Sequence, residues 1–105
     1  MRRHLAILNK ISTAIKSVAP DSEIYLYGSR ARNTAGKGSD WDILVLLDTP
    51  EISFQSEIKI IDAVYEVEIE TGEVITPVIY TKKEWYERPF NTPFFENITH
   101  DGIRI

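Results

Sequence analysis

The sequence contains no cysteine, only five glycines and five prolines, and no long run of apolar residues. The absence of cysteine excludes a disulfide framework and a thiolate zinc site, and suits a reducing cytoplasm. The longest apolar run is far too short to cross a bilayer. The basic residues at the N-terminus are not followed by the apolar segment of a signal peptide. We therefore expect a cytoplasmic protein that is not inserted in a membrane.

Positive charge is also in short supply. The 105 residues include 12 Lys and Arg against 16 Asp and Glu, a formal net charge of -4. General binding to nucleic acid is disfavoured, because its phosphates demand a basic surface. A hydrophobic content of 43% is ordinary for a globular protein, and the length suffices for one modest core. We expect a single domain across residues 1–105.

Helical and strand patterns follow one another along the chain. We predict helices over 3–19 and 52–71, a short helix from Thr81 to Tyr86, and a last helix that opens at Thr92-Pro93 and stops at Gly102. Strands are predicted over 23–27, from 40 or 41 to 47, and over 73–80, where Pro77 suggests an edge strand or a bulge. This order predicts an α/β (α+β) domain with a small mixed β-sheet and helices packed on one face.

The segment 52–71 has the least regular pattern. It contains two neighbouring apolar rows at helical spacing, Phe54, Ile58, Ile61 and Tyr65 in one and Ile60, Val64 and Val67 in the other. Residues 67–70, however, alternate like a strand. Gly72 just beyond them is a natural residue to end a helix, so we favour one long helix that ends near Thr71.

The first strand leads into Gly28 and Ser29, and Arg30 and Arg32 follow. Glycine lets the backbone pass close to a ligand. The serine can cap the short helical turn that follows, which has free N–H groups at its start. N–H groups, a hydroxyl and guanidinium charge together favour an anion such as a phosphate. On this pair alone, a tight turn with two solvated arginines is the simpler interpretation.

Two acidic residues, Asp40 and Asp42, stand at the start of the second strand. Side chains two residues apart in a strand project from the same face, about 7 Å apart along the backbone. Such carboxylates repel each other, and both stay ionised when a cation lies between them. Oxygen ligands favour Mg²⁺, which keeps coordination places for water and substrate phosphates. A lone DxD is common, and one Asp could equally cap the loop while the other is merely exposed.

The two features are separated by only ten residues. The link between them contains Gly36, Gly38 and Ser39, and its flexibility would allow the two strands to be neighbours. Transfer of a nucleotide needs both a group that holds a triphosphate and a metal that neutralises its developing charge. Lys37 in the link could reach a phosphate, although a solvated loop lysine is the simpler interpretation. Trp41 points away from its acidic neighbours, so we expect it to pack.

The string GSRAR, followed after a gap by SDWD and an apolar strand, resembles the signature of DNA polymerase β-like nucleotidyltransferases. It is most similar to their minimal form, the MNT proteins. The matching positions are Gly28, Ser29, Ala31, Arg32, Ser39, Asp40 and Asp42. Asn33 stands where glycine is usual, and asparagine also tolerates a left-handed conformation. Chain length and element order fit the family from end to end.

The resemblance implies the polymerase β-like nucleotidyltransferase fold and a Mg²⁺-dependent transfer of a nucleoside monophosphate, with AMP from ATP as the expected case, to a hydroxyl acceptor. Asp40 and Asp42 would be catalytic and would hold the metal. The nucleotide would be bound by Gly28, Ser29, Arg32 and Ser39. Arg32 is favoured over Arg30 for offsetting charge on the pyrophosphate, because it lies on the family motif.

In MNT proteins the acceptor hydroxyl is implied to lie on a partner, often a small helical HEPN protein in a toxin–antitoxin pair. A domain of this size offers little surface to enclose an acceptor, which favours such a partner or a homo-oligomer. A small-molecule hydroxyl stays open as the acceptor. No residue pattern here identifies the base of the nucleotide.

The family has a third carboxylate on the strand after the long helix, which completes the metal site and can deprotonate the attacking hydroxyl. Our best register places Thr76 there. Glu73 has the opposite strand parity, and Glu68 and Glu70 would contribute only if residues 67–70 formed a strand. Nucleotide and metal binding are therefore better supported than turnover. Two alternatives follow, a catalytically weak or inactive module that neutralises a HEPN-type partner by contact, and a domain whose motif is a relic.

Overall fold

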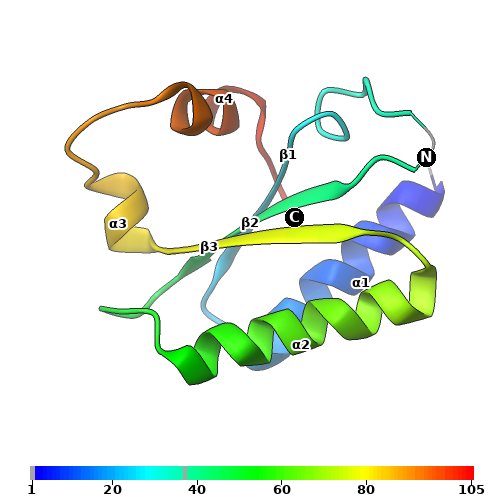
Figure 1. Ribbon diagram of the computed structural model, residues 1–105, viewed down its shortest axis with the longest axis horizontal. Helices are drawn as coiled ribbons and strands as arrows, with labels where there is room; N and C mark the ends of the chain where they lie inside the picture. The colour runs from blue at the N-terminus through cyan, green and yellow to red at the C-terminus, as the bar shows by residue number, and fades with distance from the viewer. Residues whose placement is uncertain (1, 37) are drawn as a thin grey trace.

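The computed structural model describes residues 2–36 and 38–105, and its elements follow the predicted order (Figure 1). Lys37, which the sequence indicated as a solvated loop lysine with a phosphate contact as the alternative, lies outside the described residues. The elements are α1 (Arg2–Val18), β1 (Glu23–Tyr27), β2 (Trp41–Leu47), α2 (Phe54–Thr71), β3 (Ile75–Thr81), α3 (Lys82–Tyr86), α4 (Pro93–Asp101) and β4 (Ile103–Arg104). The two-residue strand β4 had no counterpart in the sequence prediction.

The four strands form one mixed sheet in the order β3-β2-β1-β4. β1 pairs antiparallel with β2 and β4, while β2 and β3 are parallel and are connected through α2. The predicted small mixed sheet is therefore confirmed. Pro77 lies on β3, which is an edge strand, as its missing N–H donor requires.

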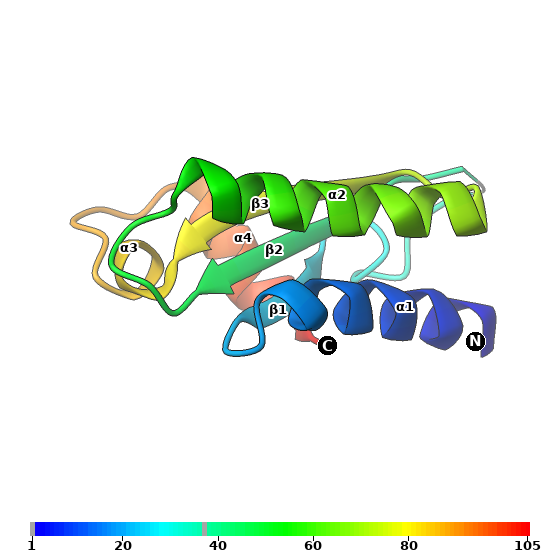
Figure 2. The same ribbon diagram turned by 90° about the horizontal axis from the view of Figure 1, so that it is seen from below.

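Helices cover both faces of this sheet. α1 and α2 lie side by side against one face (Figure 2), where the core includes Ile11, Ile15, Ile43, Val45, Ile60 and Val64. α3 and α4 cover the opposite face, where Trp85 and Ile98 pack on Leu44 and Leu46. The prediction that helices pack on one face thus holds for α1 and α2 and is corrected for α3 and α4. The reason lies in β2, whose apolar residues occupy both parities, so both of its faces must be covered.

The segment 52–71, whose pattern was ambiguous, forms one helix, α2. The position of Gly72 had favoured this interpretation. Ser53 caps its start by accepting a hydrogen bond from the Ser56 N–H. Gly72 ends it with a left-handed φ of 73°, and its N–H donates to the Glu68 carbonyl. Residues 67–70 are helical, so the strand alternative is excluded. Of the two predicted apolar rows, only the one that contains Ile60 and Val64 is buried.

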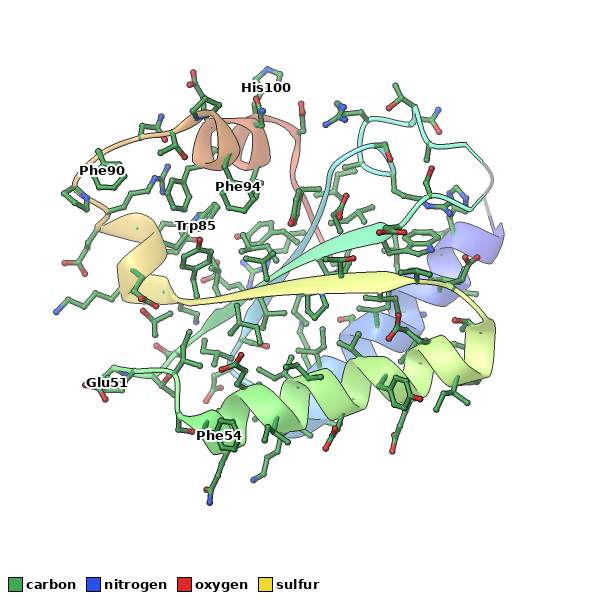
Figure 3. All side chains as sticks on the ribbon, viewed as in Figure 1. Glu51, Phe54, Trp85, Phe90, Phe94 and His100 are labelled. Carbon is green, nitrogen blue, oxygen red and sulfur yellow. The ribbon has the colours of Figure 1, made fainter. Side chains whose placement is uncertain are left out.

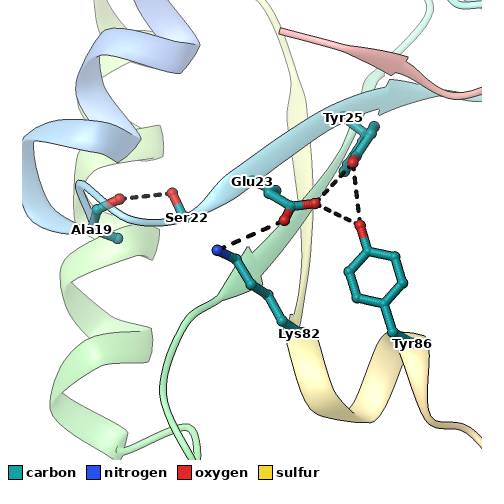
Figure 4. Close-up of polar contacts among 6 residues, drawn as sticks. All are labelled: Ala19, Ser22, Glu23, Tyr25, Lys82 and Tyr86. Carbon is teal, nitrogen blue, oxygen red and sulfur yellow. Dashed lines mark hydrogen bonds and ion pairs between the residues drawn. The ribbon is translucent and has the colours of Figure 1, made fainter.

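The two short helices begin where local signals predicted. Thr81 and Glu84 form the expected capping box, and Thr92 caps α4 with Pro93 in its first turn. Side-chain contacts also tie α3 to β1 (Figure 4).

In that network the Glu23 carboxylate accepts hydrogen bonds from Tyr86 at 2.6 Å and Tyr25 at 2.9 Å, and Lys82 lies 3.7 Å away. The Tyr86 hydrogen bond is the main cause that lowers the pKa of Glu23, and the same bond raises the pKa of Tyr86. No helix in the described part of the chain is both long and apolar enough to span a bilayer.

Candidate active site

The first half of the site is the turn after β1. Gly28 has a φ of 76°, and its carbonyl accepts the N–H groups of Ala31 and Arg32, each at 3.1 Å. The turn therefore starts at Gly28, and the expectation that the Ser29 side chain caps it is corrected. Within the described residues, the N–H groups of Ser29 and Arg30 and the Ser29 hydroxyl have no hydrogen-bond partner. The turn thus presents free donors, as an anion site requires.

Asp42 lies directly against this turn. Its backbone is paired with Tyr27, the residue before Gly28, across β1 and β2. A Cβ built on Gly28 would overlap the Asp42 carboxylate oxygen Oδ2. A side chain at position 28 would displace the carboxylate, and the positive φ of Gly28 is one that other residues rarely adopt. The two features that the sequence separates by ten residues meet at this point.

Asp40 stands just before β2 and lies close enough to influence Asp42. The pKa of Asp42 is raised, first by burial and then by the negative charge of Asp40, while Arg32 lowers it. Asp40 is exposed, whereas Asp42 is partly buried. A partly buried carboxylate whose pKa is raised by burial and by a neighbouring carboxylate, beside an arginine, forms a site suited to a cation and a phosphate.

Thr76 is the residue on β3 that pairs with Asp42 across the parallel strands β2 and β3. Its hydroxyl makes a long hydrogen bond of 3.5 Å to the Asp40 carboxylate. Among the described residues, no group of three or more His, Cys, Asp or Glu side chains could hold a metal ion. The site therefore contains a pair of carboxylates and a hydroxyl at the place where the resemblance implied a third carboxylate.

The other acidic residues considered from the sequence are placed elsewhere. Glu68 accepts the Ile75 N–H at 3.0 Å and so fixes the start of β3. Glu70 forms an ion pair with Lys10 at 2.8 Å between α2 and α1. Glu73 lies in the connection between α2 and β3, outside the strand. Glu68 and Glu70 are helical, which removes the condition under which they would have joined the site.

Arg30 is held by contacts with other residues of the domain. Its Nε and Nη2 donate to the Ser39 carbonyl at 3.2 and 2.7 Å, and its guanidinium carbon lies 4.2 Å from the centre of the Trp41 ring. Trp41 itself is 1% exposed and belongs to the core under α1 and α2, as its parity predicted. The Ser39 carbonyl is thus occupied, whereas its hydroxyl has no hydrogen-bond partner within the described residues.

The sequence matches the family model described as a nucleotidyltransferase domain over residues 8–101. The chain belongs to this family. The resemblance stated from the GSRAR and SDWD strings is therefore confirmed. A search of the curated proteins found no match.

Two solved structures have the same fold as this nucleotidyltransferase domain. One is a toxin–antitoxin with AMP-PNP, with 21% identity and a TM-score of 0.64, and the match covers 91% of this chain and 69% of that one. The other is a mutant of the toxin–antitoxin MntA-HpeT, with 20% identity and a TM-score of 0.62, covering 92% and 69%. Both likenesses support the polymerase β-like architecture.

Arg32 differs from Arg30 in acting on the charge of Asp42 in the nucleotidyltransferase domain. Its charge lowers the pKa of Asp42, and its Nη1 lies 3.6 Å from Asp101 at the end of α4. Asp101 also pairs with His100 at 2.8 Å, a contact that lowers the pKa of Asp101 and raises that of His100. Sequence reasoning missed Asp101, because nothing near it in the chain indicates that α4 reaches the turn.

Tyr27 is a second residue that sequence reasoning missed. Burial, followed by the charge of Asp42, raises the pKa of Tyr27 to about 12. Its ring meets that of Phe94 edge-on, with centroids 6.0 Å apart. Its position one residue before Gly28, at the strand pair that includes Asp42, is the signal that could have identified it.

Proposed function

We propose that this domain is a Mg²⁺-dependent nucleotidyltransferase that moves a nucleoside monophosphate, AMP from ATP, to an acceptor hydroxyl. The contact between the Asp42 carboxylate and Gly28 carries the proposal. It joins an acidic pair to a turn with free donors, and nucleotidyl transfer needs both.

The turn would hold the phosphates of the nucleotide. The N–H groups of Ser29 and Arg30 and the Ser29 hydroxyl would donate to phosphate oxygens, and Gly28 would let them approach closely. Arg32 would offset the charge on the leaving pyrophosphate, because its guanidinium already acts on Asp42. The free Ser39 hydroxyl would add a further donor.

Asp40 and Asp42 fit a hard divalent cation. Their donor set is oxygen only, and burial together with the Asp40 charge makes the ionised form of Asp42 costly without a counter-charge. Mg²⁺ is the assigned ion because it is usually held by one or two carboxylates and completed by water and phosphates. When bound, it would neutralise charge on the phosphates.

In the proposed reaction the acceptor oxygen forms a bond to the α-phosphorus while the bond from that phosphorus to the bridging oxygen breaks. Pyrophosphate leaves, and the acceptor gives up its proton. Thr76 cannot take that proton as a carboxylate would, so it passes to solvent or to a group that the acceptor brings. We expect turnover to be slower than with a positioned base by about 10²–10⁴-fold.

The acceptor is proposed to lie on a partner protein, a HEPN-type helical protein, in the cytoplasm, where ATP is available. The similar solved structures support this, because they are toxin–antitoxins and one contains AMP-PNP. A second candidate function is neutralisation of that partner by contact with little or no turnover. The pairing of Thr76 with Asp42 favours it, because it leaves the site without a third acid.

The deciding experiment incubates the protein with α-labelled ATP and Mg²⁺, alone and with the product of the neighbouring gene. Label on protein that disappears in Asp42→Asn supports transfer. A tight complex without label, unchanged by Asp42→Asn, supports neutralisation by contact. Mg²⁺ binding that survives Asp40→Ala together with Asp42→Ala would remove the proposed metal site. Phe90→Gln, a change on the α3–α4 connection, serves as the matched control.

A further inference from the structure

A row of large apolar side chains is exposed along α2. The row consists of Phe54 (74% exposed), Ile58 (39%), Ile61 (45%), Tyr65 (59%) and Ile69 (67%). Its spacings of three and four residues place all five on one face of the helix. At 1.5 Å per residue, this apolar row is about 22 Å long. Figure 3 shows Phe54 at the start of α2, at the outer end of the helix.

Packing within the domain does not account for this row. The buried face of α2 is formed by Ile60, Ala63, Val64 and Val67. The exposed row faces outward and towards the edge strand, where Ile61 lines a groove of about 230 Å³ with Ile52, Pro77 and Ile79. Contiguous apolar surface of this kind marks a place where another molecule binds.

The charges around the row are almost all negative. Residues 51–73 contain one basic residue, Lys59, and seven acidic ones: Glu51, Glu57, Asp62, Glu66, Glu68, Glu70 and Glu73. Glu68 contacts the Ile75 N–H and Glu70 pairs with Lys10 inside the domain. By helical spacing, Asp62 and Glu66 flank the row on one side and Glu57 on the other. The apolar row therefore has an acidic border.

The acidic border indicates which kind of molecule binds to the apolar row. A second copy of the chain would bring its own acidic border against the first, and like charges at an interface are costly. Addition of a strand along β3 is disfavoured by Pro77, which supplies no N–H donor at mid-strand. An amphipathic helix with basic flanks fits both the length of the row and its charge.

We propose that the apolar row of α2 is a docking surface for a partner protein that presents an apolar helical ridge bordered by Lys and Arg. The surface lies on the side of the sheet opposite Leu44 and Asp42, and Ile69 is at the end of α2 that leads to Thr76. A partner docked there leaves the acidic pair open, and its other parts can reach the site around the edge of β3. Docking does not depend on the chemistry at Asp42, although it gives the acceptor of the proposed function a place to bind.

The probe is a synthetic 18-residue amphipathic helix with leucine on one face and lysine on both borders of that face, and a twin with glutamate for lysine is its control. Amide chemical shifts of the full chain are followed by NMR during titration. The lysine peptide is expected to shift resonances along α2 and around Pro77, and the glutamate twin is expected to shift none. Binding should weaken as salt is raised, because the border charges are exposed.

Variants test each part of the surface. Ile61→Gln with Tyr65→Gln keeps the charge and the helix and should weaken binding by about tenfold or more, as loss of central apolar contacts does. Asp62→Asn with Glu66→Gln should reduce the salt dependence. Phe90→Gln is the control, because Phe90 is 66% exposed but lies on the α3–α4 connection (Figure 3). Thermal unfolding checks that each variant is folded.

Four outcomes would overturn the proposal: equal binding of the two peptides, binding of neither, shifts confined to other elements, or a dimer of the chain that Ile61→Gln with Tyr65→Gln abolishes. Asp42→Asn should bind the lysine peptide like the unchanged chain. If nucleotidyl transfer is absent while this binding holds, the proposed function fails and the docking surface stands.

Discussion

The two faces of the sheet have different chemical character. The face under α1 and α2 is a continuous aliphatic core around Ile43 and Val45, with Trp41 at its end. The face under α3 and α4 combines a smaller core of Leu44, Leu46, Trp85 and Ile98 with tyrosines, and Asp42 continues it near the start of β2. Alternate residues of β2 therefore have different roles. Those that face α1 and α2 stabilise the fold, and those on the other face include Asp42 of the candidate site.

The largest effect should come from truncating the first face. Ile43→Ala removes a fully buried side chain, and we expect the free energy of unfolding to fall by about 2–5 kcal/mol. Denaturant unfolding measures this. The exposed Leu5→Ala on α1 is the control and should change the free energy little. A loss as small for Ile43 as for Leu5 would contradict the division between the faces.

Asp42, the neighbour of Ile43 on the other face of β2, should matter for activity and not for stability. Asp42→Asn should lower the rate of nucleotidyl transfer about 100-fold or more, because the charge that holds the cation is lost. The free energy of unfolding at neutral pH should stay equal or rise, because burial and Asp40 disfavour the ionised carboxylate.

The sign of the pH dependence follows from the raised pKa of Asp42. Its folded-state pKa lies above the ordinary value of 3.8, so stability falls as pH rises from that value through the raised pKa. Asp42→Asn should remove this fall, and Mg²⁺ should offset it in the unchanged protein. Thermal unfolding at several pH values, with and without Mg²⁺, measures both. An Asp42→Asn variant that is less stable at neutral pH would contradict this cause.

A smaller effect, an increase in the rate of nucleotidyl transfer, is expected from Thr76→Asp. The change places a carboxylate beside Asp42 and Asp40, where it could accept the acceptor's proton, and we expect transfer to rise about tenfold. The rate with labelled ATP measures it, and Thr76→Asn is the matched control without a charge. No gain over Thr76→Asn would favour neutralisation by contact.

The smallest effect should come from the polar network of the second face. Tyr86→Phe removes the O–H that donates to Glu23, and we expect a loss of about 1 kcal/mol in the free energy of unfolding at neutral pH. Because the pKa of Glu23 is lowered from 4.5, this stabilisation is present above that value and is lost as pH falls through the lowered pKa. The variant and the unchanged protein should therefore converge in acid. A difference that persists there would point to lost packing of the ring.

The sequence predicted elements well where a few neighbouring residues contain the whole signal. Gly72 ends α2, Thr81 with Glu84 starts α3, and Thr92 with Pro93 starts α4, each through a local contact. Local patterns and alternation were therefore sufficient for most of the architecture.

Features that depend on contacts far apart in the chain were missed. Periodicity found both apolar rows of α2, but it could not say which one faces the core, because that depends on where α1 and the sheet lie. The second covered face, β4 and the contact of Arg32 with Asp101 join segments that are distant in sequence. The roles of Asp40, Asp42 and the turn, and the identity of the metal and nucleotide, stay predictions that the experiments above address.

Arg30 makes the geometry of the site less dependent on the loop that connects the turn to the acidic strand. Its guanidinium joins the turn directly to the Ser39 carbonyl and to Trp41. One side chain and a strand pairing therefore help to set the spacing between the turn and the acidic strand. Insertions or deletions between Asn33 and Ser39 should be tolerated, whereas shortening Arg30 should let the two halves drift apart even in a loop of unchanged length.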